Sequence, residues 1–190
     1  AKLIHISTDC VFSGEKGTSY IETDEKYGKD VYAKTKGIGE VICDNHLTLR
    51  TSVVGPELKS CGEELFHWFM NQQGSINGFT KTIWSGVTTL ELAKAVEWSI
   101  NEDITGLYHI TNNLTVSKIA LLELFKKHTK KDIEIIPVAG SNIDKSFVDT
   151  GNLMNYKIPS YDKMIANMID LINRKRTLYS QYQVIKDGQQ

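Results

Sequence analysis

Runs of apolar and β-branched residues alternate along this chain with segments whose apolar residues recur at helical spacing. The strand-like runs are residues 2–6, 47–55, 79–84, 106–110 and 133–137, and the helical segments are residues 31–45, 63–72, 88–101, 115–127 and 161–174. Strands that alternate with helices form βαβ units, because parallel neighbours need a crossover connection. The sequence therefore predicts an α/β fold built on a parallel sheet.

Helix ends and faces can be predicted at a few positions. Thr88 is expected to cap the helix that follows it, with Glu91 three residues on completing a capping box. In the segment 63–72, His67 is expected at the flank of the apolar face. The tail after Thr177 is polar and shows no core face, so it is expected to lie outside the packed part of the chain.

The 190 residues are 41% hydrophobic and carry a net charge of −1, as expected of one compact unit. This balance gives no basic field for nucleic acid, and no apolar run approaches the roughly 20 residues of a membrane span. No signal peptide precedes the first strand, and the histidines and cysteines (Cys10, Cys43 and Cys61) lack metal-ligand spacing. These features predict a cytoplasmic protein with reduced thiols and no metal.

Polar residues follow the first predicted strand directly. Thr8 and Asp9 come after the apolar run 2–6. The carboxyl ends of buried parallel strands face the crevice where open α/β sheets bind ligands. Thr8 and Asp9 are therefore candidates for contact with a ligand, although Asp9 equally fits an Asx turn that only shapes the loop.

Tyr32 and Lys36 are four residues apart in a predicted helix. Residues at this spacing lie on one helix face, so the lysine charge can stabilise a tyrosine phenolate and lower its pKa from about 10. Tyr32 is then a candidate general acid or base. The spacing alone also fits a tyrosine at the edge of the core beside a solvated lysine.

Three motifs in order give the chain a resemblance to a known family. They are Ser7-Thr8-Asp9-Cys10-Val11-Phe12-Ser13-Gly14, then Tyr32-Ala33-Lys34-Thr35-Lys36 with Gly39-Glu40, then Leu49-Arg50-Thr51-Ser52. Over residues 2 to about 175 the chain resembles the extended short-chain dehydrogenase/reductases, and within them the dTDP-4-dehydrorhamnose reductases and related nucleotide-sugar 4-ketoreductases.

The resemblance implies a fold and a division of the chain. It implies the C-terminal part of a Rossmann-like doubly wound parallel sheet with a small α+β substrate-binding lobe. The second half of the Rossmann core would comprise about 1–60 and 86–112, the interleaved lobe about 61–85 and 113–175, and a polar tail 176–190, all within one unit.

The resemblance also implies a reaction. It is the NAD(P)H-dependent reduction of the 4-keto group of a nucleotide-linked 4-keto-6-deoxy sugar, as in dTDP-L-rhamnose or related surface-polysaccharide sugar biosynthesis. Thr8, Tyr32 and Lys36 would be catalytic: Tyr32 would protonate the developing alkoxide, Thr8 would donate a hydrogen bond to it, and Lys36 would hold the nicotinamide ribose. Tyr32, Lys36, Thr51 and Ser52 would contact the cofactor, and Thr8, Asp9, Cys10 and Val53 the substrate.

Two residues depart from the family pattern. The related dehydratases carry Asp-Glu after the threonine, an acid and base pair that eliminates water, whereas this chain has Asp9-Cys10. A thiol cannot replace that carboxylate as the base, which favours a reductase over a dehydratase or epimerase. The reductases usually have Tyr at Cys10 and Trp at Val53, so an N-acetylated or otherwise altered hexosulose fits as well as the rhamnose precursor.

No glycine-rich dinucleotide fingerprint is present in the sequence. The choice between NADP and NAD is therefore not readable, and the chain is expected to function as a homodimer or with the missing N-terminal half. A non-catalytic nucleotide- or sugar-binding subunit of the same fold, like the regulatory subunit of methionine adenosyltransferase, stays open. Arg50 could reach a diphosphate, but an ion pair beneath the sheet is the preferred interpretation.

Overall fold

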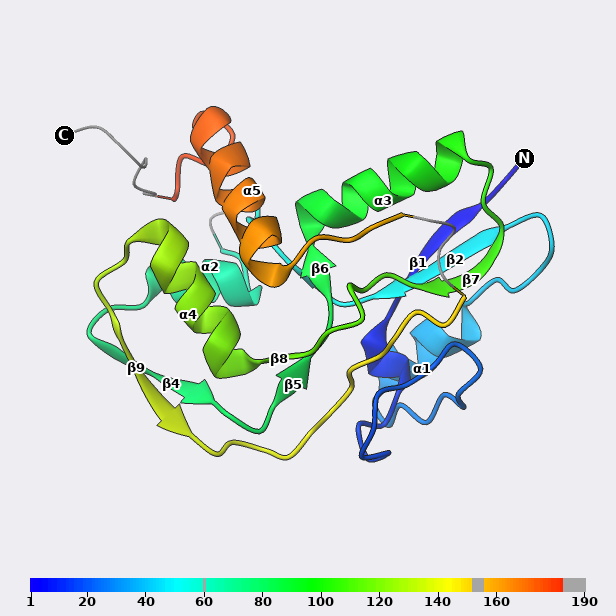
Figure 1. The fold of residues 1–190 in the computed structure, drawn as a ribbon, viewed down its shortest axis with the longest axis horizontal. Coiled ribbons are helices and arrows are strands. Elements are labelled where there is room, and N and C mark those ends of the chain that lie inside the picture. Colours follow the sequence, from blue (N-terminus) through cyan, green and yellow to red (C-terminus); the bar gives the residue numbers. More distant parts are fainter. Residues whose placement is uncertain (60, 152–155, 183–190) are drawn as a thin grey trace.

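Three parallel strands carry the candidate residues (Figure 1). In the computed structural model, which describes residues 1–59, 61–151 and 156–182, they are β1 (Ile4–Thr8), β2 (Leu47–Thr51) and β7 (Gly106–His109), in the order β1-β2-β7. Thr8 lies opposite Thr51, so the carboxyl ends of β1 and β2 meet at one edge. The predicted α/β class with a parallel sheet is confirmed.

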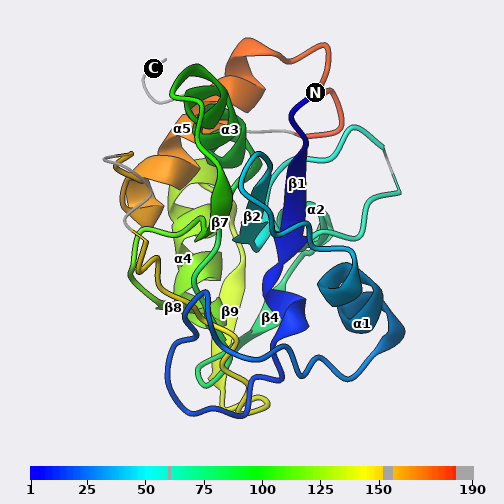
Figure 2. The same ribbon diagram turned by 90° about the vertical axis from the view of Figure 1, so that its right-hand side faces the viewer.

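Two helices cover opposite faces of this sheet. Figures 1 and 2 show α1 (Val31–Ile38) on one side and α3 (Thr89–Asn101) on the other, and the contacts of α1 are with β1 and the 3-10 helix η1 (Asp9–Val11). This arrangement is that of a doubly wound sheet.

The remaining elements form a second region, seen on the left of Figure 1. Its strands are β3 (Val53–Val54) parallel to β6 (Val87–Thr88), β4 (Ser75–Phe79) parallel to β9 (Glu134–Val138), and β5 (Ile83–Trp84) antiparallel to β8 (Val116–Ser117). Its helices are α2 (Leu65–Asn71), α4 (Lys118–Thr129) and α5 (Tyr161–Arg174). One cluster of buried apolar side chains runs from Leu47 of β2 through Phe66 and Phe125 to Met168.

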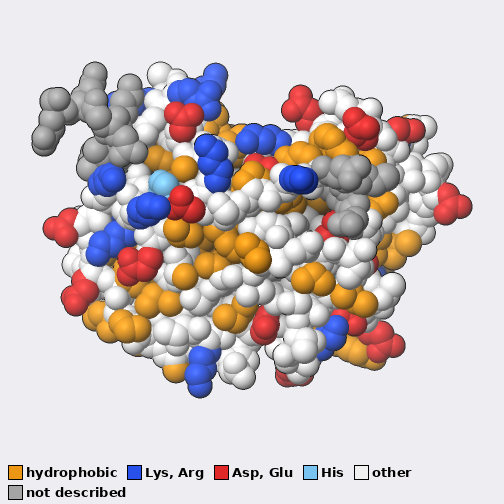
Figure 3. All heavy atoms as spheres, in the orientation of Figure 1, with side chains coloured by type: hydrophobic (Ala, Val, Ile, Leu, Met, Phe, Trp, Pro, Cys, Tyr) orange, Lys and Arg blue, Asp and Glu red, His pale blue; other side chains and the backbone are white. Residues whose placement is uncertain are grey.

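Surface charge is mixed, and no membrane-spanning helix is found among the described residues. On the face shown in Figure 3, acidic and basic side chains are interspersed. In the part of the chain that the structure describes, no helix is both long and apolar enough to cross a bilayer.

The predicted helix 31–45 is too long. The helix α1 ends at Ile38, with Gly39 as its C-cap. Two glycines within three residues weaken the helix by roughly 1 kcal/mol each relative to alanine. The next residue, Glu40, turns inward to a buried arginine, which draws the chain away from the helical path.

The predicted strand 79–84 is also wrong. The segment contains only the last residue of β4 and the two residues of β5, with a turn between them. The true strand begins at Ser75 and includes Asn77 and Gly78, which are poor strand formers. Gly78 is needed there because a Cβ atom would lie 2.6 Å from Ile119.

Helix starts were predicted with mixed success. Thr88 caps α3 by accepting the Glu91 N–H at 3.2 Å, as predicted. The reciprocal half of the capping box does not form, because the Glu91 carboxylate accepts the Tyr156 hydroxyl at 2.7 Å instead. The helix predicted from residue 115 begins at Lys118, with Ser117 as its cap.

The C-terminal segment packs against α2, contrary to the prediction of a tail without a core face. Tyr182 is 7% exposed, and its hydroxyl accepts the Glu57 N–H at 2.9 Å and lies 2.8 Å from His67 Nδ1. His67, predicted at the helix flank, is itself buried beneath this tyrosine. Gln181 donates to the Glu57 carbonyl oxygen, so both backbone polar groups of Glu57 are held by the segment. Residues 183–190 of the predicted tail lie outside the described residues.

We predict that Tyr182→Phe lowers the free energy of unfolding by about 1–3 kcal/mol, because it leaves a backbone N–H and a buried imidazole nitrogen without their partner. Tyr179→Phe is the matched control, since the Tyr179 hydroxyl bonds to none of the described residues. Urea unfolding followed by circular dichroism measures both. Equal stabilities of the two variants would contradict the role of the Tyr182 hydroxyl.

Candidate functional site

Thr8 closes β1 and caps the turn that follows. Its side chain accepts the Cys10 N–H at 3.2 Å and donates to Asp9 Oδ1 at 3.1 Å. The residue is 8% exposed, so its hydroxyl is fixed at the carboxyl edge of the sheet. Thr8 and Asp9 therefore occupy the position at which a parallel sheet presents groups to a ligand.

Asp9 gathers polar groups from three other segments. Burial raises the pKa of Asp9, while hydrogen bonds with Thr8 and Ser52 and the charges of Lys145 and Lys118 oppose that rise. Ser52, just after β2, also accepts the Trp84 indole N–H at 2.9 Å. The structure thus brings Thr8, Asp9 and Ser52 together at the carboxyl ends of β1 and β2.

The helix α1 presents the tyrosine and the lysine. Asp30 caps it by accepting the Ala33 N–H at 2.7 Å. The preceding loop approaches so closely that a Cβ atom at Gly28 would lie 2.5 Å from the Cys10 carbonyl oxygen, which requires glycine. Tyr32 is 55% exposed on the outer side of this helix.

Lys36 reaches the free edge of β1. Its ammonium donates to the Ile6 carbonyl oxygen at 2.6 Å. The Leu3 carbonyl accepts the Leu47 N–H, so alternate residues from Leu3 face β2, and the Ile6 carbonyl faces away from the sheet. Lys36 therefore satisfies a backbone acceptor that a neighbouring strand would otherwise use.

A buried ion pair lies behind these residues. Arg50 of β2 donates to Glu40 from Nε at 2.7 Å and from Nη2 at 2.8 Å, and Ser7 donates to the same carboxylate at 2.6 Å. Burial opposes ionisation of Glu40, but the hydrogen bonds from Arg50 and Ser7 and the Arg50 charge outweigh it and lower the pKa of Glu40 to about 2. The preferred interpretation of Arg50, an ion pair beneath the sheet, is confirmed.

The same arginine holds two loops. Its Nη1 donates to the Glu22 carbonyl oxygen at 2.9 Å and lies 3.3 Å from His109 Nε2. The Glu22 carboxylate in turn accepts the hydroxyl of Thr150 at 2.5 Å. Burial lowers the pKa of His109 to about 4 despite the nearby Glu22 charge, so the imidazole is neutral near pH 7.

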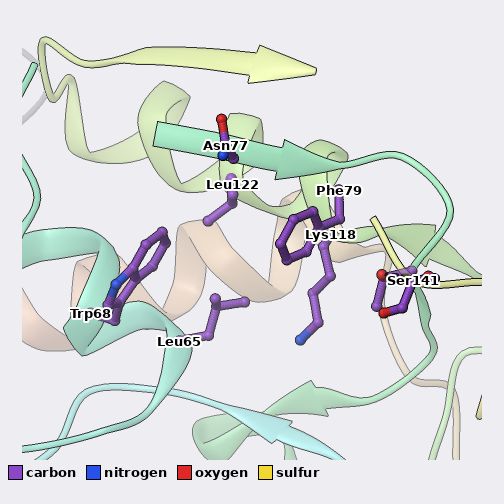
Figure 4. A pocket seen from close by; sticks show the side chains of 8 residues that line it. Leu65, Trp68, Asn77, Phe79, Lys118, Leu122 and Ser141 are labelled. Atoms are coloured by element: carbon purple, nitrogen blue, oxygen red, sulfur yellow. Dashed lines mark hydrogen bonds between the residues drawn. The ribbon is translucent and has the colours of Figure 1, made fainter. Parts of the chain in front are cut away.

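A cavity of about 330 Å³ lies between α2, α4 and β4 (Figure 4). It is lined by Leu65, Trp68, Asn77, Phe79, Thr82, Lys118, Leu122 and Ser141. Most of the lining is apolar, with a few polar groups, as in typical small-molecule sites. The charge of Lys118 acts on Asp9, which connects the cavity to the end of β1.

The contacts of three further residues give less support to their predicted roles in binding cofactor or substrate. The Thr51 hydroxyl donates to the Ile110 carbonyl oxygen at 3.1 Å, which supports a role in joining β2 to the segment after β7. Val53 packs against the main core. Cys10 is partly buried in the turn after β1, next to Asp9.

Sequence reasoning missed the residues of the cavity. Neither Lys118 nor Trp68 stands in a recognisable motif of the sequence. The signal available in the sequence was Trp68 followed by a short strand that contains Asn77 and Gly78. Only the folded chain brings these segments together at the cavity.

Comparison with known proteins assigns the family. A sequence model described as the RmlD substrate binding domain matches residues 1–146 of the chain. The chain belongs to this family. This confirms the resemblance drawn from the three motifs.

Two known proteins match parts of the chain. The spore coat polysaccharide biosynthesis protein SpsK of Bacillus subtilis (strain 168) is 30% identical over 117 residues, which are 60% of this chain and 41% of that protein. A dTDP-4-dehydrorhamnose reductase of Shigella flexneri is 45% identical over 58 residues, or 28% of this chain and 19% of that protein.

Solved structures share the fold. The dTDP-4-dehydrorhamnose reductase of Bacillus anthracis str. Ames, in complex with NADP, matches with a TM-score of 0.76 at 20% identity, covering 90% of this chain and 66% of that one. A dTDP-glucose 4,6-dehydratase from the same organism, in complex with NAD, matches with a TM-score of 0.68 at 15% identity, covering 96% of this chain and 65% of that one. This chain thus spans less than two thirds of the length of each of these relatives.

We predict that Glu40→Gln lowers the free energy of unfolding by about 3–5 kcal/mol at pH 7, because it leaves the Arg50 charge buried without its partner. The folded-state pKa of Glu40 lies below its ordinary value, so the stability from its ionised form is complete above about pH 4.5 and is lost as the pH falls through 2. The difference between wild type and variant should therefore shrink at low pH.

Glu15→Gln is the control for this experiment, since Glu15 pairs with Lys29 on an exposed surface and should contribute less than about 1 kcal/mol. Guanidinium unfolding at pH 7 and pH 3 gives both values. If Glu40→Gln and Glu15→Gln are equally stable at pH 7, the buried pair is not what anchors α1.

Proposed function

We propose that this chain forms the substrate-binding part of an NAD(P)H-dependent reductase that acts on the 4-keto group of a nucleotide-linked 4-keto-6-deoxy sugar. One observation carries the proposal. Thr8 lies at the carboxyl end of β1, and the helix packed against that strand presents Tyr32 and Lys36. Membership of the RmlD substrate binding domain family supports the same reaction class.

The proposed chemistry divides among three residues. Tyr32 gives its phenolic proton to the C4 oxygen as negative charge develops there, and the Lys36 ammonium stabilises the phenolate that remains. The Thr8 hydroxyl, which donates to Asp9 in the structure, turns to donate to the same substrate oxygen. The reduced nicotinamide supplies the hydride when it is bound.

The residue after Asp9 favours reduction over elimination. A dehydratase needs a base at this position to accept a proton from the sugar. Burial and the charge of Asp9 both raise the pKa of the Cys10 thiol, so it is protonated at neutral pH and cannot serve as that base. Because Cys10 and Val53 are smaller than the aromatic residues of most such reductases, the proposal includes N-acetylated and other altered hexosuloses.

A non-catalytic nucleotide-sugar-binding subunit is the second candidate. The observation in its favour is that the Lys36 ammonium is bound to the Ile6 carbonyl rather than directed at Tyr32. In this case the cavity and the end of β1 would bind a nucleotide sugar without turnover.

We further propose that the free edge of β1 pairs with a strand from the part of the fold that the relatives possess and these residues lack. Such a strand would bond to the Ile6 carbonyl and compete with Lys36 for it. Unpaired edges attract other strands, and the sheet described here has only three. Docking of that strand would make the Lys36 ammonium available to Tyr32 and the ribose.

We predict that Tyr32→Phe, in a protein that carries the whole fold, lowers turnover by roughly 10²–10⁴ and leaves nucleotide-sugar binding little changed, because only proton transfer is lost. Steady-state kinetics with NADPH and a 4-keto sugar nucleotide measure this. Tyr27→Phe, on an exposed loop tyrosine, should keep wild-type turnover. A Tyr32→Phe enzyme with undiminished turnover would sink the catalytic assignment, and a wild type without turnover would favour the binding subunit.

We also predict that the 190-residue chain alone does not bind NADPH. Tyr32 and Lys36 can contact only the nicotinamide ribose, whereas the pyrophosphate and adenine need a glycine-rich turn at a helix N-terminus. Isothermal titration calorimetry of NADPH into the chain is the test. Micromolar binding would place the dinucleotide site within these residues and refute the proposal that another segment supplies it.

A further inference from the structure

The cavity holds a lysine without a polar partner. Lys118, the first residue of α4, extends from the helix into the space beside Leu65 and Phe79 (Figure 4). Its side chain is partly buried, yet its ammonium forms no hydrogen bond or ion pair with any residue that the structure describes. Half-buried charges are normally paired, because removing them from water is costly.

Two carboxyl groups lie in the neighbourhood without pairing with Lys118. Burial lowers the pKa of Lys118, and the charges of Asp9 and Glu64 oppose that shift. Glu64 precedes α2 and Asp9 follows β1, so the Lys118 charge interacts with groups from both elements. Burial raises the pKa of both carboxyl groups, which disfavours their ionised forms. Neither group is therefore a strong counter-ion for Lys118.

The position of Lys118 in the cavity suggests what it binds. Trp68, Phe79 and Leu65 line the cavity together with Lys118, and the Lys118 charge acts on Asp9 at the end of β1. A nucleotide sugar has the same order of groups: a flat base, a charged diphosphate, and a sugar. An oxyanion beside Lys118 would also lie near the N-terminus of α4, where the helix dipole favours negative charge.

We propose that Lys118 is an anion-binding residue of this cavity and pairs with an oxyanion of the bound nucleotide sugar. The oxyanion is the diphosphate, which offers the ammonium charged oxygen acceptors. The inference rests on the proposed function for the class of ligand. To that function it adds Lys118 as the residue that binds the charged group of the ligand.

The test is a titration of the 190-residue chain followed by the fluorescence of Trp68, with Trp68→Phe identifying its share of the signal. The probes are thymidine, dTDP, dTDP-glucose and dTDP-glucuronic acid. Lys118→Met should weaken the binding of dTDP about 10- to 100-fold and leave thymidine unchanged, whereas Lys118→Arg should retain most of the affinity for dTDP.

The two sugar probes check that the diphosphate is the bound oxyanion. If Lys118 binds the diphosphate, Lys118→Met weakens dTDP-glucose and dTDP-glucuronic acid by the same factor. Weakening of dTDP-glucuronic acid alone would place the contact at a sugar carboxylate and overturn the proposal.

Lys163→Met is the matched control, because Lys163 is exposed on α5 away from the lining of the cavity. It should bind every probe as wild type does, and circular dichroism should show each variant folded. Equal affinities of wild type and Lys118→Met for all phosphorylated probes would overturn the role of Lys118. A wild type that binds none of them would instead refute the proposed nucleotide-sugar function.

Discussion

The pairing of Glu40 with Arg50 is the interaction on which the candidate site depends. Both side chains are almost fully buried, and the carboxylate accepts two bonds from the guanidinium and one from Ser7. Glu40 follows the end of α1, and Arg50 belongs to the central strand of the sheet. Because buried pairs are stable only with near-ideal geometry, this pair permits few positions of α1 relative to β1. The packing of α1, which carries Tyr32 and Lys36, against β1 and η1 follows from that constraint.

The same arginine connects the site to parts of the chain distant in sequence. Its third nitrogen holds the loop at Glu22, whose carboxylate reaches Thr150 and the backbone N–H of His109. The loop before α1 and the segment after β9 are thus fixed to one sheet. A strand residue that resembles a candidate phosphate ligand in the sequence is, in the folded chain, the centre of the scaffold.

The sequence predicted those features that depend on local pattern. Alternating strands and helices, the Thr88 cap and the polar ends of β1 and β2 follow from periodicity and capping chemistry over a few residues. The predictions are wrong where contacts between residues distant in sequence determine the bounds of a helix or strand. The helix α1 stops early because Glu40 is drawn to Arg50, and β4 includes Gly78 because Ile119 approaches it. Lys118 has significance only through the elements that surround it, so no pattern in its own segment could reveal it.

The candidate site has two parts with different physical character. At the end of β1, hydroxyl and carboxyl groups are held by backbone turns and are suited to proton transfer. In the cavity, apolar and aromatic side chains are suited to binding a flat or apolar group. The charges of Lys118 and Asp9 act on each other, which links the two parts.

The attachment of Tyr182 to Glu57 has a consequence for the order of folding. The two residues are 125 positions apart, and Glu57 in turn accepts the Glu64 N–H at the start of α2. During synthesis the amino-terminal part of a chain emerges and collapses first. The sheet that carries Thr8 can therefore form before Glu57 and His67 have gained their contacts with Tyr182. The contacts of Tyr182 with Glu57 and His67 form only after residue 182 has left the ribosome.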